Sequence, residues 1–477
     1  MKRRTANVTR IGLFAWLFAF TCCQPLREGD PDLFYTLMLL PLGNSDELLH
    51  DVVAEVGFLA TSGKVARYQK ISETGGGFTG TLNDHDHLGR SIVSPGDING
   101  DGVNDLVVGA HKDDDGGADR GALWVFFMNT DGTVDSCQKI SETEGNFTGV
   151  LHTGGFGDEF GGAVTGIGDL DNDGIVDLAV GAKLDLGNNI GAVWILFMNS
   201  DGTVKSHQKI SSLEGGFNGP LDSDDYFGRS VAGPGDLNGD GTPDLLVGAS
   251  RDDDGGGDRG AVWVLFLNTD GTVASHQKIS DTEGDFHGSL GDASYFGSSV
   301  TAPGDLDGDG ISEIAVGAYQ DNDGGDWRGA VWLLFMNFNG TVRSSQKISN
   351  TSGGFSGVLD DHDRFGEAIS APGDLDQDGT PDLVVGAKND DDGGGDYGAL
   401  WVLFLNPNGS VRSYQKISQT EGSFHGTLSA ASNLGSSVTS VGDINGDHVP
   451  DLAAGAWYDD GSGDNRGAVW VFFLKAE

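Results

Sequence analysis

The chain has 477 residues, 79 of them Gly, and its 72 Asp and Glu residues outnumber 28 Lys and Arg residues, which gives a net charge of −44 at pH 7. So acidic a chain repels phosphate backbones and has no basic stripe, which argues against nucleic-acid binding. High charge with much Gly is also typical of disorder, but 37 % of residues are hydrophobic and 25 Phe and 9 Trp suffice for a core.

The N-terminus has the pattern of a secretory signal peptide, which we assign to residues 1–23. A basic start is followed by an apolar run over 11–20 and by small residues. Lipid attachment at Cys22 or Cys23 is an alternative, although the preceding residues fit a bacterial lipobox poorly. No later segment reaches the roughly 20 apolar residues of a transmembrane helix. We therefore expect a secreted or cell-surface protein.

Residues 64–477 contain one unit six times, with a period of 69 or 70 residues. Each unit carries the string Gln-Lys-Ile-Ser, which starts at Gln69, Gln138, Gln208, Gln277, Gln346 and Gln415. Each also carries a Trp in an apolar run, at Trp124, Trp194, Trp263, Trp332, Trp401 and Trp470. A period this long holds a complete small sheet with its loops. We expect the six Trp to pack between blades.

The third unit predicts four strands in meander order. Residues 227–232 alternate in polarity, 244–249 form a short apolar run, and 261–267 are apolar throughout, as in a strand buried on both faces. An Asp-Gly hairpin turn leads to the more polar stretch 272–280. Such units, repeated around the chain, predict an all-β protein, a β-propeller of four-stranded blades.

The two ends of the chain favour a closed ring over a solenoid of stacked sheets. The last unit lacks its Gln-Lys-Ile-Ser strand, and a spare copy of that strand lies at 64–72. Supplying it from the N-terminus would remove an open sheet edge and give six blades. Residues 24–63 are an N-terminal linker with room for extra strands. The alternative of seven blades uses 33–42 and 52–59 as a degenerate N-terminal blade.

Between its first and second strands every unit carries an acidic nonapeptide. Oxygen side chains at positions 1, 3, 5 and 9, Gly at position 6 and the carbonyl of position 7 suit Ca²⁺. The ligands expected from the six loops are Asp97, Asn99, Asp101, Val103, Asp105; Asp169, Asp171, Asp173, Ile175, Asp177; Asp236, Asn238, Asp240, Thr242, Asp244; Asp305, Asp307, Asp309, Ile311, Glu313; Asp374, Asp376, Asp378, Thr380, Asp382; and Asp443, Asn445, Asp447, Val449, Asp451.

These loops are not EF-hands, because position 12, where an EF-hand needs Glu, is Val or Ala inside an apolar strand. Mg²⁺ is disfavoured by its stricter octahedral geometry. We expect about six Ca²⁺ ions, one in each loop. A second acidic cluster, such as 252–258, joins the second and third strands. We expect these clusters to be solvated turns, with weaker ion sites as the alternative.

The chain resembles the FG-GAP repeat family, whose best-known members are the N-terminal propellers of integrin α chains. Phe227-Gly228 matches the FG half of the motif and Gly248-Ala249 matches its GA, although no unit has the Pro. The resemblance implies a propeller that binds ligands or partner proteins outside the cell. The chain departs from integrins in having six units rather than seven, no leg domains and no transmembrane helix.

We expect an adhesion or ligand-binding module for an extracellular protein or glycan, not an enzyme, because no catalytic constellation stands out. The alternatives are a propeller enzyme acting on glycans or esters, and a structural spacer. Catalysis or ligand binding requires residues that break the repeat. We therefore expect a ligand site on irregular loops, namely 154–159, Trp327 and Trp457.

Overall fold

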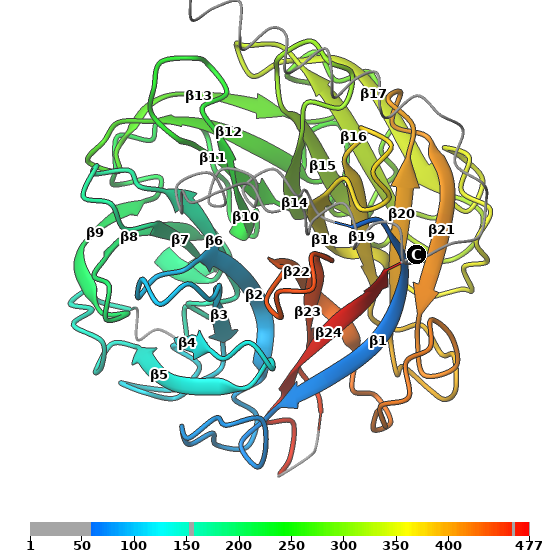
Figure 1. Ribbon diagram of the computed structural model, residues 1–477. Helices are drawn as coiled ribbons and strands as arrows, with labels where there is room; N and C mark the ends of the chain where they lie inside the picture. The colour runs from blue at the N-terminus through cyan, green and yellow to red at the C-terminus, as the bar shows by residue number, and fades with distance from the viewer. Residues whose placement is uncertain (1–58, 152–156, 460–462, 477) are drawn as a thin grey trace, which may run out of the picture. The chain divides into compact units, whose positions relative to one another are not determined.

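The computed structural model describes residues 59–151, 157–459 and 463–476, and they form six four-stranded antiparallel sheets arranged in a ring (Figure 1). The six-bladed β-propeller predicted from the repeats is confirmed. The predicted signal peptide and most of the predicted linker, including the strands proposed for a seventh blade, lie outside the described residues.

The first strands of the blades surround the axis of the ring (Figure 1). They are β2 (Leu88–Gly96), β6 (Ala163–Gly168), β10 (Phe227–Gly235), β14 (Phe296–Gly304), β18 (Phe365–Gly373) and β22 (Leu434–Gly442). The second strands are β3 (Asp105–Ala110), β7 (Asp177–Ala182), β11 (Asp244–Ala249), β15 (Glu313–Ala318), β19 (Asp382–Ala387) and β23 (Asp451–Ala456). The third strands are β4 (Ala122–Met128), β8 (Ala192–Met198), β12 (Ala261–Leu267), β16 (Ala330–Met336), β20 (Ala399–Leu405) and β24 (Ala468–Ala476). The fourth strands are β5 (Val134–Ile140), β9 (Val204–Ile210), β13 (Val273–Ile279), β17 (Val342–Ser349), β21 (Val411–Ile417) and β1 (Thr61–Ile71).

The ring closes in the way the spare N-terminal strand predicts. β1 pairs with β24 in antiparallel register, with Lys70 opposite Trp470, so the first strand of the chain completes the last blade. The contact between blades six and one also repeats the other blade contacts, since Ser437 Oγ donates to the Gly89 carbonyl at 2.8 Å. Closure therefore leaves no unpaired edge strand at this junction.

The FG and GA glycines explain why neighbouring blades can approach so closely. A Cβ on Gly248 of β11 would lie 2.0 Å from the carbonyl oxygen of Gly297 in the next blade. Gly297 itself has φ +87°, which an L side chain rarely adopts. Ser230 Oγ donates to the same Gly297 carbonyl at 2.9 Å. The repeated motif is thus a backbone contact between blades.

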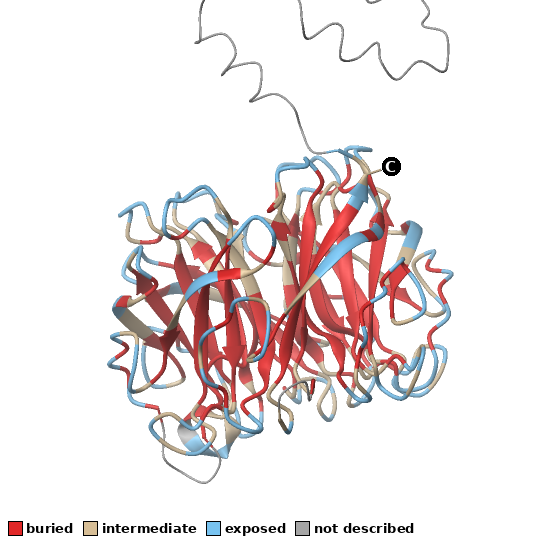
Figure 2. Cartoon of the chain, turned by 60° about the horizontal axis from the view of Figure 1, so that its bottom comes forward, coloured by how far each residue is buried: buried red, intermediate tan, exposed pale blue. Residues whose placement is uncertain are grey.

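The hydrophobic core consists of six clusters, each built from two adjacent blades. The second strands and, apart from the last two residues of β24, the third strands are buried, whereas exposed residues lie in the loops on both faces of the ring and on the outer strands (Figure 2). The repeat-spaced Trp residues lie in these clusters, and Trp263 is 1 % exposed. The prediction that they pack between blades is confirmed.

The second blade departs most from the others. Its first strand starts only at Ala163, and the loop after β7 contains a five-residue π-helix, η1 (Asp185–Asn189), which the sequence analysis did not predict. In the described part of the chain, no helix has the length and hydropathy needed to cross a membrane.

Candidate metal centres

The acidic nonapeptides lie where predicted, between the first and second strands of each blade. In the third loop, Asp236 Oδ1 accepts from the backbone N–H groups of Gly239 and Asp240, and Asp236 Oδ2 accepts from Gly241 at 2.7 Å. Gly239 and Gly241 both have positive φ, which lets the backbone fold around the carboxylate. Hydrogen bonds within the loop therefore hold its backbone around the first Asp without the help of an ion.

Position 9 fixes each loop to the blade. Asp244 begins β11, is fully buried, and accepts from the backbone N–H groups of Leu237 at 2.9 Å and Leu267 at 3.3 Å. Burial raises the pKa of all six position 9 carboxyls: to about 6 for Asp105, Asp177 and Asp244, to about 7 for Glu313 and Asp382, and to about 8 for Asp451. A divalent cation would stabilise the ionised forms that burial disfavours.

The loops fall into two classes according to position 3. Where it is Asp, the carboxylates of positions 1, 3 and 9 bring an oxygen each within 4.8 Å of one another. These three groups are Asp169, Asp171 and Asp177; Asp305, Asp307 and Glu313; and Asp374, Asp376 and Asp382. Where it is Asn, the amide nitrogen donates to a loop carboxylate, as Asn238 does to Asp240 at 2.9 Å. Carboxylate groups that could hold an ion are thus formed in the second, fourth and fifth loops.

A basic residue on the outer strand accompanies each Asp at position 3. Lys205 Nζ lies 2.6 Å from Oδ2 of both Asp171 and Asp173. Arg343 and Arg412 make the same two contacts in the fourth and fifth loops. In the three loops with Asn, the equivalent residues are Ala66, Asp135 and Ala274. Positions 3 and 5 of these three loops thus both pair with the cation, and position 5 is absent from the converging groups.

The Asp-type loops also contain oxygens that fit a metal ion. Among the described residues, Asp171 Oδ1, Glu313 Oε1 and Asp376 Oδ1 are buried and have no hydrogen-bond partner. A buried carboxylate oxygen without a partner costs free energy unless a donor or cation reaches it. All-oxygen ligands of this kind suit Ca²⁺.

The first Asp of each second acidic loop is buried and paired, so the prediction of a solvated turn was wrong for this residue. Asp252 is 3 % exposed, and its carboxylate lies 2.6 Å from Lys278 Nζ, the Lys of Gln-Lys-Ile-Ser. The same pair occurs in every blade: Lys70–Asp459, Lys139–Asp113, Lys209–Asp185, Lys278–Asp252, Lys347–Asp321 and Lys416–Asp390. The first Asp of each loop instead ties it to the outer strand of its own blade.

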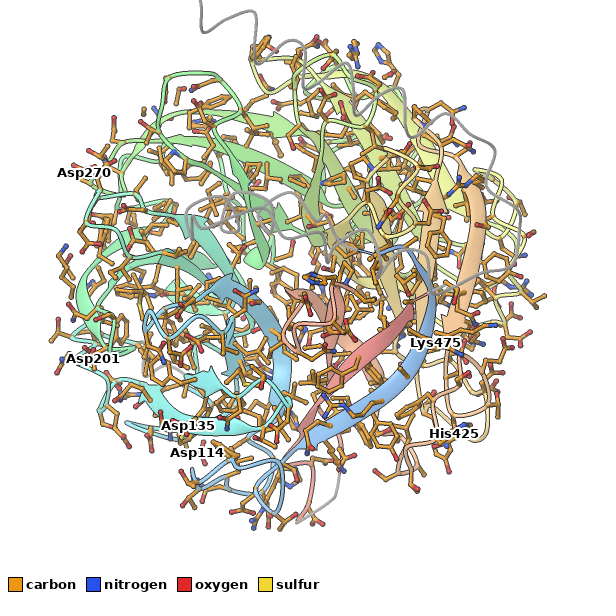
Figure 3. All side chains as sticks on the ribbon, viewed as in Figure 1. Asp114, Asp135, Asp201, Asp270, His425 and Lys475 are labelled. Carbon is orange, nitrogen blue, oxygen red and sulfur yellow. The ribbon has the colours of Figure 1, made fainter. Side chains whose placement is uncertain are left out.

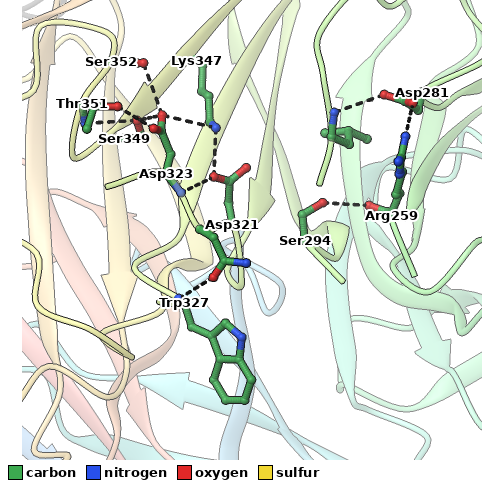
Figure 4. Close-up of polar contacts among 12 residues, drawn as sticks. Arg259, Asp281, Ser294, Asp321, Asp323, Trp327, Lys347, Ser349, Thr351 and Ser352 are labelled. Carbon is green, nitrogen blue, oxygen red and sulfur yellow. Dashed lines mark hydrogen bonds and ion pairs between the residues drawn. The ribbon is translucent and has the colours of Figure 1, made fainter. Parts of the chain in front are cut away.

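Further contacts reinforce these pairs, as the fourth blade shows (Figure 4). Lys347 contacts Asp321 and Asp323, and Asp323 also accepts hydrogen bonds from the hydroxyls of Ser349 and Thr351 at 2.6 Å each. Burial acts to raise the pKa of Asp323, but the two hydroxyls and Lys347 hold it at about 2. Each of the six Lys residues also lies over the Trp of the neighbouring strand, at 5.3 Å for Lys70 and Trp470.

Five of the six units match the model of the FG-GAP repeat, over residues 89–126, 227–265, 296–334, 365–403 and 434–472. The chain carries FG-GAP repeats. The match leaves out the second unit, the one whose first strand is shortened.

The FG-GAP propeller is distantly similar to integrin α chains over about half its length. Integrin alpha-3 of Cricetulus griseus is 33 % identical over 207 residues, which are 42 % of this chain and 17 % of the relative. Integrin alpha pat-2 of Caenorhabditis elegans is 29 % identical over 254 residues, 50 % of this chain and 18 % of the relative. Integrin alpha-5 of Xenopus laevis is 34 % identical over 237 residues, 49 % and 20 % respectively. The aligned part is thus a fifth or less of each relative's length.

Proposed function

We propose that this protein is a calcium-binding, integrin-α-like FG-GAP propeller that acts outside the cell as an adhesion or ligand-binding module. It would consist of a signal peptide (1–23), a linker (24–63) and the propeller (64–477). The observation that supports it best is the Asp-rich loop found at one place in all six blades, with converging carboxylates in three of them. The ligands are the positions 1, 3, 5, 7 and 9 given above, with one Ca²⁺ in each loop.

Calcium would act on the fold rather than on a substrate. Each loop joins the inner two strands of a blade, and in all loops but the fourth the position 9 carboxylate accepts a hydrogen bond from the third strand. An ion held by positions 1, 3 and 9 would therefore link the loop to the buried part of the sheet. Because Ca²⁺ would bind the folded loops and hardly the unfolded chain, it would stabilise the native propeller by mass action.

The metal part of the proposal is tested by calcium titration with isothermal calorimetry. We expect about six sites in the wild type, one per loop. The variant Asp169→Ala with Asp171→Ala should lose one of them. Asp201→Ala is the matched control, because Asp201 lies in an outer hairpin turn at the rim of the ring (Figure 3). The absence of calcium binding by the wild type would contradict the proposal.

The ligand-binding part is tested on arrays of glycans and extracellular proteins, with calcium and with EDTA. Capture of one ligand class that is lost in EDTA supports a binding module. Turnover of an arrayed substrate would instead favour the enzyme alternative, and neither capture nor turnover would favour a spacer.

A further inference from the structure

One mouth of the ring lies on the face opposite the acidic loops. In the third blade, Phe227 at the start of β10 pairs with Ala249 at the end of β11, whereas Gly235 and Asp244 pair at the other end, beside the nonapeptide. Residues next to the FG and GA motifs therefore meet on the far face. They line a cavity of about 240 Å³, which adjoins a second one of about 460 Å³.

The residues of this mouth differ from blade to blade, although their neighbours are nearly invariant. The residue after GA is, from the first to the sixth blade, His111, Lys183, Ser250, Tyr319, Lys388 and Trp457. The residue after FG is Arg90, Gly162, Arg229, Ser298, Glu367 and Ser436. The six units have thus kept the contacts between blades while their side chains diverged at this mouth, as expected of a site for an asymmetric ligand.

The charge of the cavity is opposite to that of the chain. Its lining contains six basic residues, Arg90, Lys112, Lys183, Arg229, Arg251 and Lys388, and one acidic residue, Glu159. The whole chain has 28 Lys and Arg residues against 72 Asp and Glu residues. Chance placement would put an excess of acidic residues here, so the positive charge is concentrated in this mouth.

Only part of this charge is neutralised within the protein. Glu159 pairs with Lys183, and Glu367, just below the cavity, contacts Arg229 at 2.9 Å and Lys388 at 3.0 Å. Among the described residues, no carboxylate lies within 4.0 Å of Arg90, although Arg90 is 7 % exposed. Burial, together with repulsion from Arg229, lowers the pKa of Arg90 to about 10. An anion placed here would relieve that repulsion.

Unpartnered donors and aromatic faces complete the lining. The Nδ1 atom of His111, a residue only 2 % exposed, is buried and has no hydrogen-bond partner among the described residues, and the same holds for Trp457 Nε1. The Arg251 guanidinium lies over the rings of Tyr226 and Tyr295, at 4.7 and 5.5 Å from their centroids. The site therefore offers cations, free polar atoms and flat apolar walls in a space that suits one small ring.

We propose that this mouth binds an anionic sugar, with its carboxylate or sulfate group on Arg90 and Arg251 and its ring against the aromatic side chains. Guanidinium groups bind carboxylates and tetrahedral oxyanions such as sulfate through two hydrogen bonds at once, which favours such a group over a neutral hydroxyl. The inference rests on the proposed role as a ligand-binding module and names its ligand class. Trp457 and Glu159, singled out from the sequence as parts of irregular loops, line this cavity.

The test is isothermal titration of the full chain, in calcium, with a sulfated heparin disaccharide, a hyaluronan tetrasaccharide and neutral maltotetraose. We expect one or both anionic sugars to bind and maltotetraose not to bind. The variants Arg90→Ser and Arg251→Gln use residues already present at the equivalent positions, Ser298 and Gln320. Each should weaken anionic-sugar binding at least about tenfold, since a charged hydrogen bond is lost.

Lys64→Ser is the control, because it removes one exposed cation from β1 and should leave binding unchanged. An unchanged thermal midpoint in calcium verifies that the two mouth variants fold. Equal binding of neutral and anionic sugars, no binding of either, or unchanged affinity in both mouth variants would overturn the inference. So would binding of a poly-aspartate peptide in place of both sugars. Calcium titration of the same samples separates this failure from failure of the calcium-binding proposal.

Discussion

The six units have similar sequences on one face of the propeller and different sequences on the other. On one face all six loops keep the same acidic pattern, with the position 9 carboxyls buried at the start of each second strand. On the other face no two blades have the same pair of residues after the FG and GA motifs, and these residues are mostly basic or aromatic. What every blade needs for its own fold is repeated, and what a single ligand would use occurs once.

The two faces also differ in charge. The acidic face gathers like charges that repel one another unless a cation is bound, so its stability should depend on calcium. The positive charge of the basic mouth would instead be balanced by its anionic ligand. The buried Lys–Asp pairs belong with the repeated features, because they occur in all six blades. Changes to repeated residues should therefore affect folding, and changes to the mouth should affect binding alone.

The largest loss of stability should come from breaking one Lys–Asp pair. Lys278→Met removes the counter-ion of the buried Asp252 carboxylate, which keeps only its hydrogen bond from the Asp254 N–H, and we expect the free energy of unfolding to fall by about 3–5 kcal/mol. Urea denaturation measures it, with Lys64→Met on the exposed part of β1 as the control. Adding Asp252→Leu should recover most of the loss. If Lys278→Met is as stable as the control, the pair contributes nothing to the stability of the fold.

Besides the position 9 carboxyls, which calcium would keep ionised, three acidic residues that precede first strands should make the stability depend on pH. Burial raises the pKa of Asp86, Asp225 and Asp363 from 3.8 to about 7. The native state then retains protons that the unfolded chain releases, so their contribution to stability is lost as pH rises from about 4 to about 7. Blades four and six have Ser294 and Ser432 at this position.

A triple Asp→Ser variant at these three positions should therefore lose less stability than the wild type between pH 5 and pH 7.5. Urea denaturation at both pH values, with calcium in excess, gives the comparison. Parallel pH profiles for the two proteins would show that these carboxyls are ionised in the native state.

A smaller effect is expected at the sixth acidic loop, which has His448 where the others have Gly. Its φ is +67°, a conformation that costs a side-chain-bearing residue free energy. His448→Gly should raise stability in calcium by about 1 kcal/mol. Gly241→His is the reverse change in the third loop and should cost a similar amount. We also expect the sixth loop to lose calcium first during chelation, and a sixth site as tight as the others would contradict this.

The smallest change in calcium affinity and stability is expected from removing a basic residue that accompanies Asp at position 3. Asp171 and Asp173 raise the pKa of Lys205, so its ammonium group remains charged beside the second loop. Lys205→Ala, which copies Ala274 of the third blade, should raise the calcium affinity of that loop and weaken the calcium-free protein. High salt should reduce the difference. Weaker calcium binding in the variant would show that Lys205 orients the ligands instead of competing with the ion.

Most of the fold could be predicted from the sequence because each blade depends on local patterns. The third strands are continuous apolar runs, and the Gln-Lys-Ile-Ser strand is missing at one end of the chain and spare at the other. The acidic loops could be placed too, since all of their side chains lie within nine consecutive residues.

The Lys–Asp pairs and the basic mouth were missed because they join residues far apart in the chain. Lys278 and Asp252 are 26 residues apart, and only the register of the three strands β11, β12 and β13 brings them together. A signal was present: an Asp stands three residues after GA in all six units, even in the second, which lost the rest of its cluster. Comparing the six units position by position would also have shown the mouth, as variable positions flanked by invariant ones.

The repeated acidic face should hold the ring together, and the divergent mouth should not. Scanning calorimetry of the wild type and of the variant Arg90→Ser with Arg251→Gln, in EDTA and in excess calcium, tests it most directly. We predict that calcium raises the thermal midpoint of both proteins by the same amount. An unchanged midpoint would mean that the nonapeptides are merely acidic turns, and a rise confined to the wild type would mean that the two faces are not independent.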